Sequence, residues 1–326
     1  MSEQEKIGIV LLNMGGPDSL DAVKPFLYNL FSDRDIIRLP GPYILQRLLA
    51  SVISARRSGK SKKYYKAIGG KSPILEITSR LADKLSAFLT QHGIPAECFV
   101  AMRYWHPFAE DALQSVNARG IKRVVGFSLY PQYCSATSGS SIRDLKITTE
   151  KLQHDLVLSF IDKFYNYPDY IACLQSRIED ALESLPQEKK SQAHLVFSAH
   201  SVPKKLIKGG DPYFDHTRKT FDMVIERFRG FSCHLSFQSR SGSAKWLEPD
   251  TMTLLDNLVS SGEKTLIIVP ISFVSDHVET LYEIDIQYRA LVERQGGTLV
   301  RTESFNDADD FVVCLASIVR EHLIST

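Results

Sequence analysis

Several features of common functional classes are missing from this sequence. Its five cysteines lie far apart and form no C-x-x-C pair, which argues against a zinc ribbon or a cysteine-ligated iron–sulfur cluster and fits reduced thiols. No apolar run reaches the ~18 residues that a membrane-spanning helix needs. The net charge is only +1, so we expect no nucleic-acid partner.

Familiar catalytic and nucleotide-binding motifs are missing as well. The first apolar run ends in NMGGP, which lacks the G-x-G-x-x-G pattern of nicotinamide-binding folds, and SATSGSS lacks the P-loop lysine. DHVETLYE is not the zinc motif H-E-x-x-H, and no G-x-S-x-G nucleophile elbow occurs. The opening MSEQEKIGIVLL has no basic segment before a long apolar run, so we expect no signal peptide and a cytoplasmic location.

Short apolar runs rich in β-branched residues alternate with amphipathic segments. This alternation predicts an α/β fold with parallel sheets covered by helices on both faces. The length of 326 residues favours two domains, which we place at 1–165 and 166–326. An alternative is that the last helix packs back on the first domain. The expected strands are IGIVLLNM, CFVAMRYW, RVVGFSLY, DLVLSFIDKF, AHLVFSAH, CHLSFQSR, TLIIVPISF and GTLVRTESF, and four of the expected helices are Asp169–Leu182, Asp211–Arg229, Glu248–Ser260 and Asp307–Leu323.

The second half of the chain resembles the first half in order. KRVVGFSLYPQYCSATSGSSI aligns with KTLIIVPISFVSDHVETLYEI, and IGIVLLNMGGP aligns with HLVFSAHSVP. A third pair joins LVLSFIDKFYNYPDYIACLQSRIEDAL to TLVRTESFNDADDFVVCLASIVREHL. We interpret this as a duplicated four-stranded unit. Ligands of parallel open sheets bind at the carboxyl ends of the strands, so the candidate site residues should lie there.

An insertion at about 26–66 interrupts the first half. Within Tyr43–Lys66 an apolar helical stripe precedes a run of lysines and arginines. One interpretation is a lip that contacts a membrane surface or an apolar ligand with acidic groups. The other is an ordinary helix that packs on the core and carries a solvated charged end, and the residues leave both open.

The stretch SDHVETLYEID, at the end of an apolar strand, concentrates ionisable groups. If a helix begins near Asp276, then Asp276, Glu279 and Glu283 share one face, where like charges repel unless protons or a cation relieve them. His277 lies in the same stretch, and His200 ends another apolar run. One imidazole with a row of carboxylates suits proton and metal-ion exchange.

Eight motifs, in order and over nearly the whole chain, resemble those of ferrochelatases: LLNMGGP, YYKAIGGKSPI, MRYWHP, YPQYCSATSGSS, FSAHSVP, GDPY, QSRSG with WLEPDT, and SDHVETLYEID. The resemblance implies two similar Rossmann-like domains of class II chelatase type, each a four-stranded parallel sheet flanked by helices, with a cleft between them. It also implies a lyase that inserts Fe²⁺ as a substrate into a porphyrin and releases two protons.

By the same resemblance, His200 and Glu279 are the catalytic residues and the metal contacts. Which of the two is the base stays open. Asp276 and His277 orient Glu279, and Glu283 continues a path for protons or metal ions. Many relatives carry another glutamate one turn further on, where this chain has Gln287, so the acidic row is shorter here.

The resemblance further implies porphyrin contacts, with Met14 favouring protoporphyrin IX over coproporphyrin. The implied contacts are Met14, Arg57, Ser72, Arg103, Tyr104, Tyr133 and Trp246. Only Cys314 lies near the end of the chain, so we expect no iron–sulfur cluster and no tightly bound cofactor. Peripheral contact of Tyr43–Lys66 with the inner face of a membrane, and partners that transfer haem or porphyrin, are expectations too. A porphyrin carrier without catalysis and a sirohydrochlorin- or cobalt-type chelatase are the alternatives.

Overall fold

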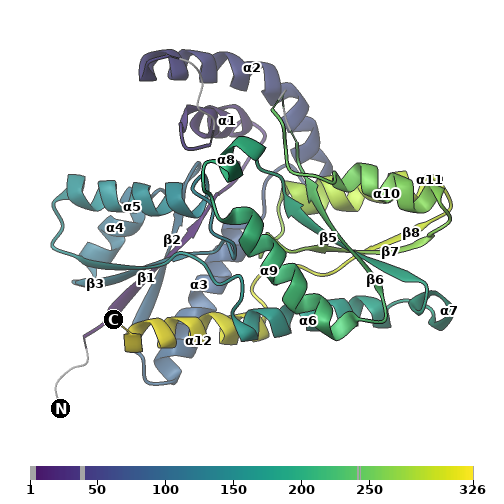
Figure 1. Ribbon diagram of the computed structural model, residues 1–326. Helices are drawn as coiled ribbons and strands as arrows, with labels where there is room; N and C mark the ends of the chain where they lie inside the picture. The colour runs from purple at the N-terminus through teal and green to yellow at the C-terminus, as the bar shows by residue number, and fades with distance from the viewer. Residues whose placement is uncertain (1–4, 37–40, 241, 243, 326) are drawn as a thin grey trace. The chain divides into compact units, whose positions relative to one another are not determined.

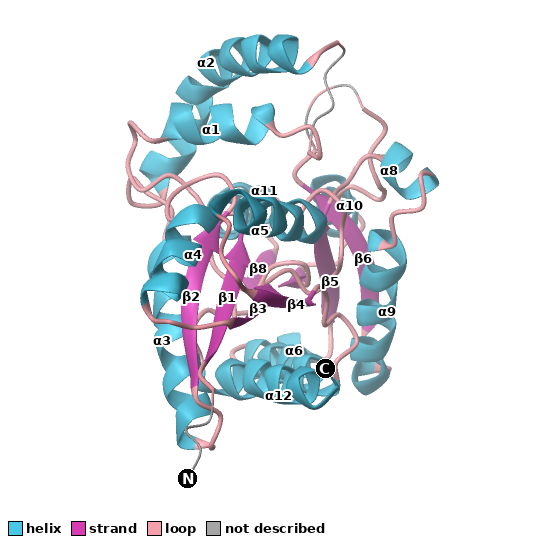
Figure 2. Cartoon of the chain, turned by 90° about the vertical axis from the view of Figure 1, so that its left-hand side faces the viewer, coloured by secondary structure: helices cyan, strands magenta, loops and turns pink. Residues whose placement is uncertain are grey.

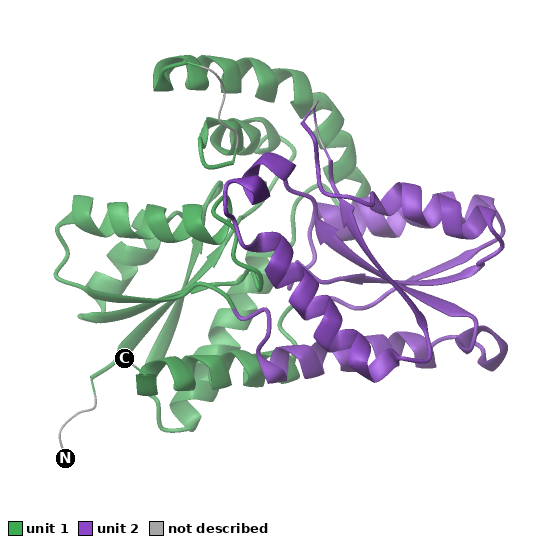
Figure 3. Cartoon of the chain, viewed as in Figure 1, with its two compact units in different colours: residues 1–163, 306–326 green, residues 164–305 purple. Residues whose placement is uncertain are grey.

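The computed structural model describes residues 5–36, 41–240, 242 and 244–325. It divides into two compact units (Figure 3): unit 1 comprises residues 1–163 and 306–326, and unit 2 comprises residues 164–305. The division thus falls two residues before the one expected at 165, and the last helix belongs to unit 1. There its His322 lies 2.9 Å from the Ser159 hydroxyl, and Lys84 binds Asp309 at 2.9 Å.

The elements follow one another as the sequence pattern predicts (Figure 1). Unit 1 contains β1 (Ile7–Asn13), α1 (Val23–Ser32), α2 (Tyr43–Ala67), α3 (Ile74–Gln91), β2 (Ala96–Met102), α4 (Ala109–Ala118), β3 (Arg123–Ser128), α5 (Ser138–Leu152), β4 (Val157–Ile161) and α12 (Asp309–Ser325). Unit 2 contains α6 (Pro168–Glu183), α7 (Gln187–Lys190), β5 (Ala193–His200), α8 (Lys204–Lys208), α9 (Tyr213–Ile225), η1 (Glu226–Phe228), β6 (Ser232–Gln238), α10 (Thr251–Ser260), β7 (Thr265–Pro270), η2 (Glu279–Tyr288), α11 (Arg289–Arg294) and β8 (Thr298–Arg301).

Each unit has one four-stranded parallel sheet, and the two sheets share one topology. The strand orders are β2-β1-β3-β4 and β6-β5-β7-β8, so each strand of unit 1 has a counterpart in unit 2. This confirms the predicted fold class and agrees with a duplicated unit. Several strands end sooner than predicted: residues 103–105 and 271–273 are loops, and the first of these loops carries the candidate site residues Arg103 and Tyr104.

Helices cover both faces of each sheet, as buried parallel strands require (Figure 2). In unit 1, α4 and α5 build one core cluster with the sheet, and α3 packs on β2 with α12 behind it. In unit 2, the cluster on one face joins α10, η2 and α11 to the sheet, whereas α6 and α9 contact β7 and β6. The central strands are apolar because both of their faces are covered: β1 and β7 are buried along their whole length, whereas the edge strand β4 begins at the exposed Val157.

Helix α2 does not pack its apolar stripe on the core. Its buried positions are Gln46, Ala50, Ser54 and Tyr65, and the Gln46 amide donates to the Phe31 carbonyl of α1 at 2.8 Å. The stripe is largely exposed: the exposed fraction is 73 % for Ile44, 62 % for Leu48 and 50 % for Val52. The interpretation as an ordinary core-packed stripe is therefore wrong, because small and polar residues make the helix contact. No helix in the part of the chain that the structure describes is long and apolar enough to cross a membrane.

Candidate functional site

Strand β5 ends in His200, whose side chain meets a glutamate from the neighbouring strand's continuation. His200 Nδ1 lies 2.8 Å from Glu279 Oε2. The backbone fixes the histidine from both sides: its N–H donates to Ser272 Oγ at 2.8 Å, and its carbonyl accepts from the Tyr213 hydroxyl at 2.8 Å. The structure thus brings together the two residues that the sequence singled out, at the carboxyl edge of the unit 2 sheet.

Ser239 joins Glu279 to Glu283. Its hydroxyl oxygen lies 2.9 Å from Glu279 Oε2 and 2.6 Å from Glu283 Oε2, and the Gln238 amide adds a bond to Glu283 Oε2 at 3.3 Å. A serine hydroxyl carries one hydrogen, so it can donate to only one of these carboxylates. The other short contact requires a proton on the carboxyl group. Two acids and one hydroxyl therefore form a chain of groups that share protons.

The two glutamates are aligned by an unusual helix. Residues 279–288 form a π-helix, in which hydrogen bonds join residues five apart and a turn holds more residues than the 3.6 of an α-helix. Side chains four positions apart therefore lie more nearly above one another than in an α-helix. This lets Glu279 and Glu283 reach the same hydroxyl. The sequence pattern predicts a helix here but not this winding.

Burial and neighbouring charges set the protonation of the cluster. Burial alone would raise the pKa of Glu279, but the charge and hydrogen bond of His200 lower it to about 2. Burial opposes a charge on His200 too, yet Glu279 raises its pKa overall. Burial and then the charge of Glu279 raise the pKa of Glu283 to about 7. Near neutral pH, Glu279 is ionised and Glu283 exchanges its proton, which accounts for the two contacts of Ser239.

The contact with Glu279 also decides which histidine nitrogen can act as a base. An ionised carboxylate only accepts hydrogen bonds, so Nδ1 of His200 carries the hydrogen of the 2.8 Å contact. Nε2 is then the atom that takes up or releases a proton. The imidazole is 35 % exposed and the Glu279 side chain 18 % exposed, so the histidine is the more accessible of the two. This arrangement can accept protons from a bound molecule and pass them inward.

Asp276 and His277 lie close to the pair but bind elsewhere. Asp276 Oδ1 accepts from Thr280 Oγ1 at 3.0 Å and pairs with Arg301 Nη1 at 3.1 Å. The π-helix begins at Glu279, so Asp276 precedes it and shares no helical face with the two glutamates; its carboxylate pairs with an arginine instead. His277 Nδ1 lies 3.0 Å from the Ser275 carbonyl, and burial lowers the pKa of this imidazole.

Arg103 and Tyr104 occupy a charged network in unit 1. Arg103 lies 3.0 Å from Asp33 Oδ2 and 3.5 Å from Asp144 Oδ1, so two carboxylates already neutralise its guanidinium. Tyr104 is 2 % exposed, and its hydroxyl donates to Asp33 Oδ2 at 2.7 Å. Ser140 Oγ also contacts this carboxylate at 2.6 Å. These contacts hold both residues in place within unit 1, and their expected contacts with the porphyrin ring and its propionates stay predictions.

The other proposed porphyrin contacts are divided between the units. In unit 1, Met14 follows β1 and is partly buried, and the same loop packs against Ser72 so closely that a Cβ on Gly16 would lie 2.5 Å from the serine. Arg57 is exposed on α2, where its guanidinium lies 5.5 Å above the Phe31 ring. Tyr133 in unit 1 and Trp246 in unit 2 are partly buried.

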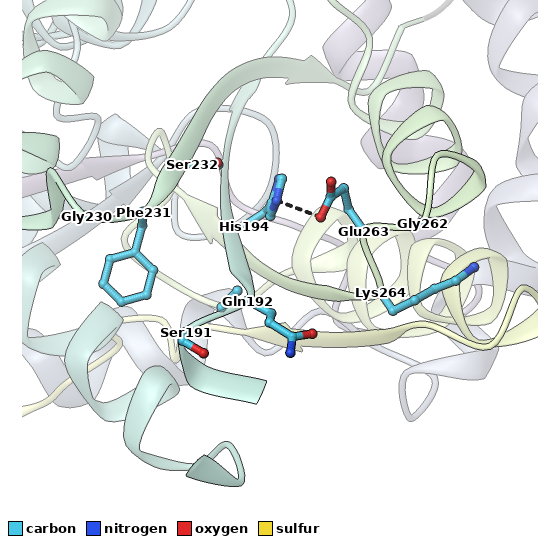
Figure 4. A pocket seen from close by; sticks show the side chains of 10 residues that line it. Ser191, Gln192, His194, Gly230, Phe231, Ser232, Gly262, Glu263 and Lys264 are labelled. Atoms are coloured by element: carbon cyan, nitrogen blue, oxygen red, sulfur yellow. Dashed lines mark ion pairs between the residues drawn. The ribbon is translucent and has the colours of Figure 1, made fainter. Parts of the chain in front are cut away.

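A second histidine cluster lies at the opposite, amino edge of the unit 2 sheet. His194 pairs with Glu263 at 3.0 Å and contacts His234 at 3.1 Å, beside a polar cavity of about 270 Å³ (Figure 4). None of the predicted site residues lines this cavity. Within the described ranges, no group of three or more His, Cys, Asp and Glu side chains is arranged to hold a metal ion.

Several residues of the candidate site were not predicted from the sequence. Ser239 has a φ of 65°, a conformation that non-glycine residues seldom adopt, and it lies in the motif QSRSG at the end of β6. Position at a strand end was the signal that could have found it. Gln238, the last residue of β6, shares this signal, whereas Tyr213, the first residue of α9, does not. Arg301 could not be found because its two carboxylate partners precede it by 16 and 25 positions in the sequence.

Removing the ionisable group at position 283 should change the pH dependence of stability. The pKa of Glu283 in the folded protein, about 7, lies above the usual 4.5 of a glutamate, so ionising Glu283 costs folded-state free energy as pH rises from 4.5 to 7. Glu283→Gln should therefore raise the free energy of unfolding above pH 7 by on the order of 1 kcal/mol, relative to its effect below pH 4.5. Urea unfolding at pH 4 and pH 8 measures this, and an equal effect at both values would contradict the assignment.

Comparison with known proteins identifies the family of this chain. A family model described as Ferrochelatase matches residues 6–323. The ferrochelatase of Geotalea daltonii is 47 % identical over 317 residues, which cover 97 % of this chain and 98 % of the relative. That of Aquifex aeolicus is 41 % identical over 320 residues, covering 98 % of this chain and all of the relative.

Solved structures extend the likeness of the fold. SirB from Bacillus subtilis with Fe³⁺ has a TM-score of 0.58 at 10 % identity, over 98 % of this chain and 95 % of that one. DR2241 from Deinococcus radiodurans, described as similar to chelatases, has a TM-score of 0.53 at 13 % identity, over 96 % of this chain and 55 % of that one. At such identities the likeness concerns the fold alone. The match over nearly the whole length and the identities above 40 % show that this chain belongs to the ferrochelatase family.

Proposed function

We propose that this protein is a lyase that inserts Fe²⁺, as a substrate, into protoporphyrin IX and releases two protons. The observation that supports this most is the 2.8 Å contact of His200 with Glu279, which continues through Ser239 to Glu283. Metal insertion must remove two pyrrole protons and deliver a hard divalent cation to the same place. An accessible imidazole backed by carboxylates suits both tasks.

His200 accepts a pyrrole proton at Nε2, while its Nδ1–H remains hydrogen-bonded to Glu279. The imidazolium that forms is stabilised by the ionised Glu279, whose low pKa of about 2 keeps it from taking the proton itself at neutral pH. The imidazolium then releases the proton at Nδ1, which passes through Glu279, protonated only in transit, and through Ser239 to Glu283. Glu283, with a pKa of about 7, both binds and releases protons near neutral pH. Glu279 and His200 are also the groups that meet the incoming iron.

The preference for protoporphyrin IX rests on Met14, in the loop after β1. Its thioether is apolar and flexible, which suits a ring face without further polar groups. The alternative substrate is coproporphyrin. A carrier that binds porphyrin without catalysis would need no proton-sharing chain, so the Glu279–Ser239–Glu283 arrangement favours an enzyme over a carrier. The identities above 40 % to ferrochelatases argue against a sirohydrochlorin-type chelatase.

The function is tested by following the Soret band of protoporphyrin IX with Fe²⁺ or Zn²⁺ under anaerobic conditions. The wild type should insert metal into protoporphyrin faster than into coproporphyrin or sirohydrochlorin. His200→Ala should abolish insertion while porphyrin binding, measured by fluorescence quenching, is retained, because only the proton acceptor is lost. His194→Gln is the matched control: this histidine lies on the same strand at the opposite edge, and its variant should keep wild-type turnover. Turnover by His200→Ala would remove the assigned role.

We propose in addition that α2 contacts a membrane surface. The exposed apolar stripe of α2 includes Ile44, Leu48 and Val52, and the same helix carries exposed basic residues such as Arg47 and Lys60. Apolar side chains beside basic ones suit the boundary of an anionic bilayer. A cytoplasmic protein with this helix would bind the inner face of the membrane peripherally.

Replacing both Ile44 and Leu48 by serine should weaken binding to anionic vesicles at least tenfold, since burying one such side chain contributes about 1.5–3 kcal/mol. Vesicle sedimentation measures this. Ile147→Ser is the matched control, because Ile147 is also exposed (56 %) on a helix of unit 1, and its variant should bind as the wild type does. Equal binding by the double variant and the wild type would contradict the proposed membrane contact.

A further inference from the structure

Arg301, the last residue of β8, joins two carboxylates through one guanidinium. Its Nε and Nη2 lie 3.0 and 2.9 Å from the two oxygens of Asp285, and its Nη1 lies 3.1 Å from Asp276 Oδ1. The side chain is only 12 % exposed, so water screens these contacts little. Ser304 completes the arrangement by donating to Asp276 Oδ1 at 2.7 Å.

In the sequence, these two aspartates lie on either side of residues 279–283, the segment that carries both site glutamates. Asp276 precedes Glu279 by three residues, and Asp285 follows Glu283 by two. Arg301 itself is held by the sheet, where its backbone pairs with Ile268 of β7. One cross-link therefore ties both ends of this segment to a fixed strand. Neither Asp276 nor Asp285 contributes to the chain of contacts from His200 to Glu283.

The segment between these carboxylates needs such a restraint. A π-helix is a rare winding that seldom extends beyond one turn, and α-helical hydrogen bonds are its usual alternative. The like charges of Glu279 and Glu283 would also separate if the winding relaxed. A guanidinium binds a carboxylate with two parallel bonds, so it fixes direction as well as distance, whereas a lysine ammonium fixes neither.

We propose that Arg301 is a positioning residue for metal insertion. Through Asp276 and Asp285 it holds the π-helical winding, and this keeps Glu279 and Glu283 on Ser239 and Glu279 on His200. The proposal rests on the proposed function, because it assigns Arg301 a part in the same reaction. Arg301 touches neither substrate; it acts on the rate only through the glutamates.

Arg301→Lys keeps the positive charge but removes the paired hydrogen bonds of the guanidinium. Asp285→Asn keeps the shape of the side chain but removes its negative charge. Each should lower kcat for Fe²⁺ or Zn²⁺ insertion about tenfold to a hundredfold, the cost of a misplacement near 1 Å. The KM for protoporphyrin should stay within about twofold. Arg289→Lys is the matched control, because Arg289 meets Asp285 at 3.4 Å from the more exposed side (43 %), and its kcat should stay within about twofold.

Two further readouts separate positioning from a general loss of structure. Rates are compared per folded molecule, with the folded fraction taken from thermal unfolding. The double variant Arg301→Lys with Asp285→Asn should be no slower than the slower single variant, because both remove one link. A kcat of Arg301→Lys near the wild-type value, or a fall matched by a rise in KM, overturns the proposal. An inactive wild type would instead overturn the proposed function, so the two failures are distinguishable.

Discussion

The contact between His200 and Glu279 is the interaction on which the rest of the site depends. Removing a carboxylate and an imidazole from water is costly, and a second glutamate four residues away adds repulsion. The pair offsets these costs through its hydrogen bond of 2.8 Å, and Ser239 and Gln238 both contact Oε2 of Glu283. The repulsion and the burial raise the pKa of Glu283 to about 7, and a group that releases protons near neutral pH requires such a value.

The duplicated fold carries this chemistry in one unit only. Both units present strand ends followed by a helix at corresponding positions, yet the segment after β3 begins its helix with serines where the segment after β7 has Glu279 and Glu283. The charges near the corresponding edge in unit 1, Asp33 and Asp144, are paired with Arg103. One copy of the fold thus uses its polar groups to hold its own loops, whereas the other exposes a histidine backed by exchangeable protons.

The sequence pattern predicted the parts of the structure that depend on local periodicity and on strand ends. Eight apolar runs became the eight strands, and His200 and Glu279 meet because parallel strands end at one edge. Features set by distant partners were not predicted. Asp276 binds Arg301, 25 residues away, and the sequence of η2 predicts a helix without indicating its π-winding. The contact of Tyr104 with Asp33 was not predicted either, since nothing in MRYWHP indicates the carboxylate that accepts its hydroxyl hydrogen.

The central claim is that the ionised Glu279 beside His200 drives proton removal during metal insertion. Its most direct test is the single-turnover rate of Fe²⁺ insertion into protoporphyrin IX by Glu279→Gln, measured anaerobically against the wild type. An amide keeps the shape and the hydrogen bond but not the charge that stabilises the imidazolium, so the rate should fall at least a hundredfold while porphyrin binding is unchanged. A fall of less than about threefold would contradict the claim and would assign the carboxylate chemistry to Glu283.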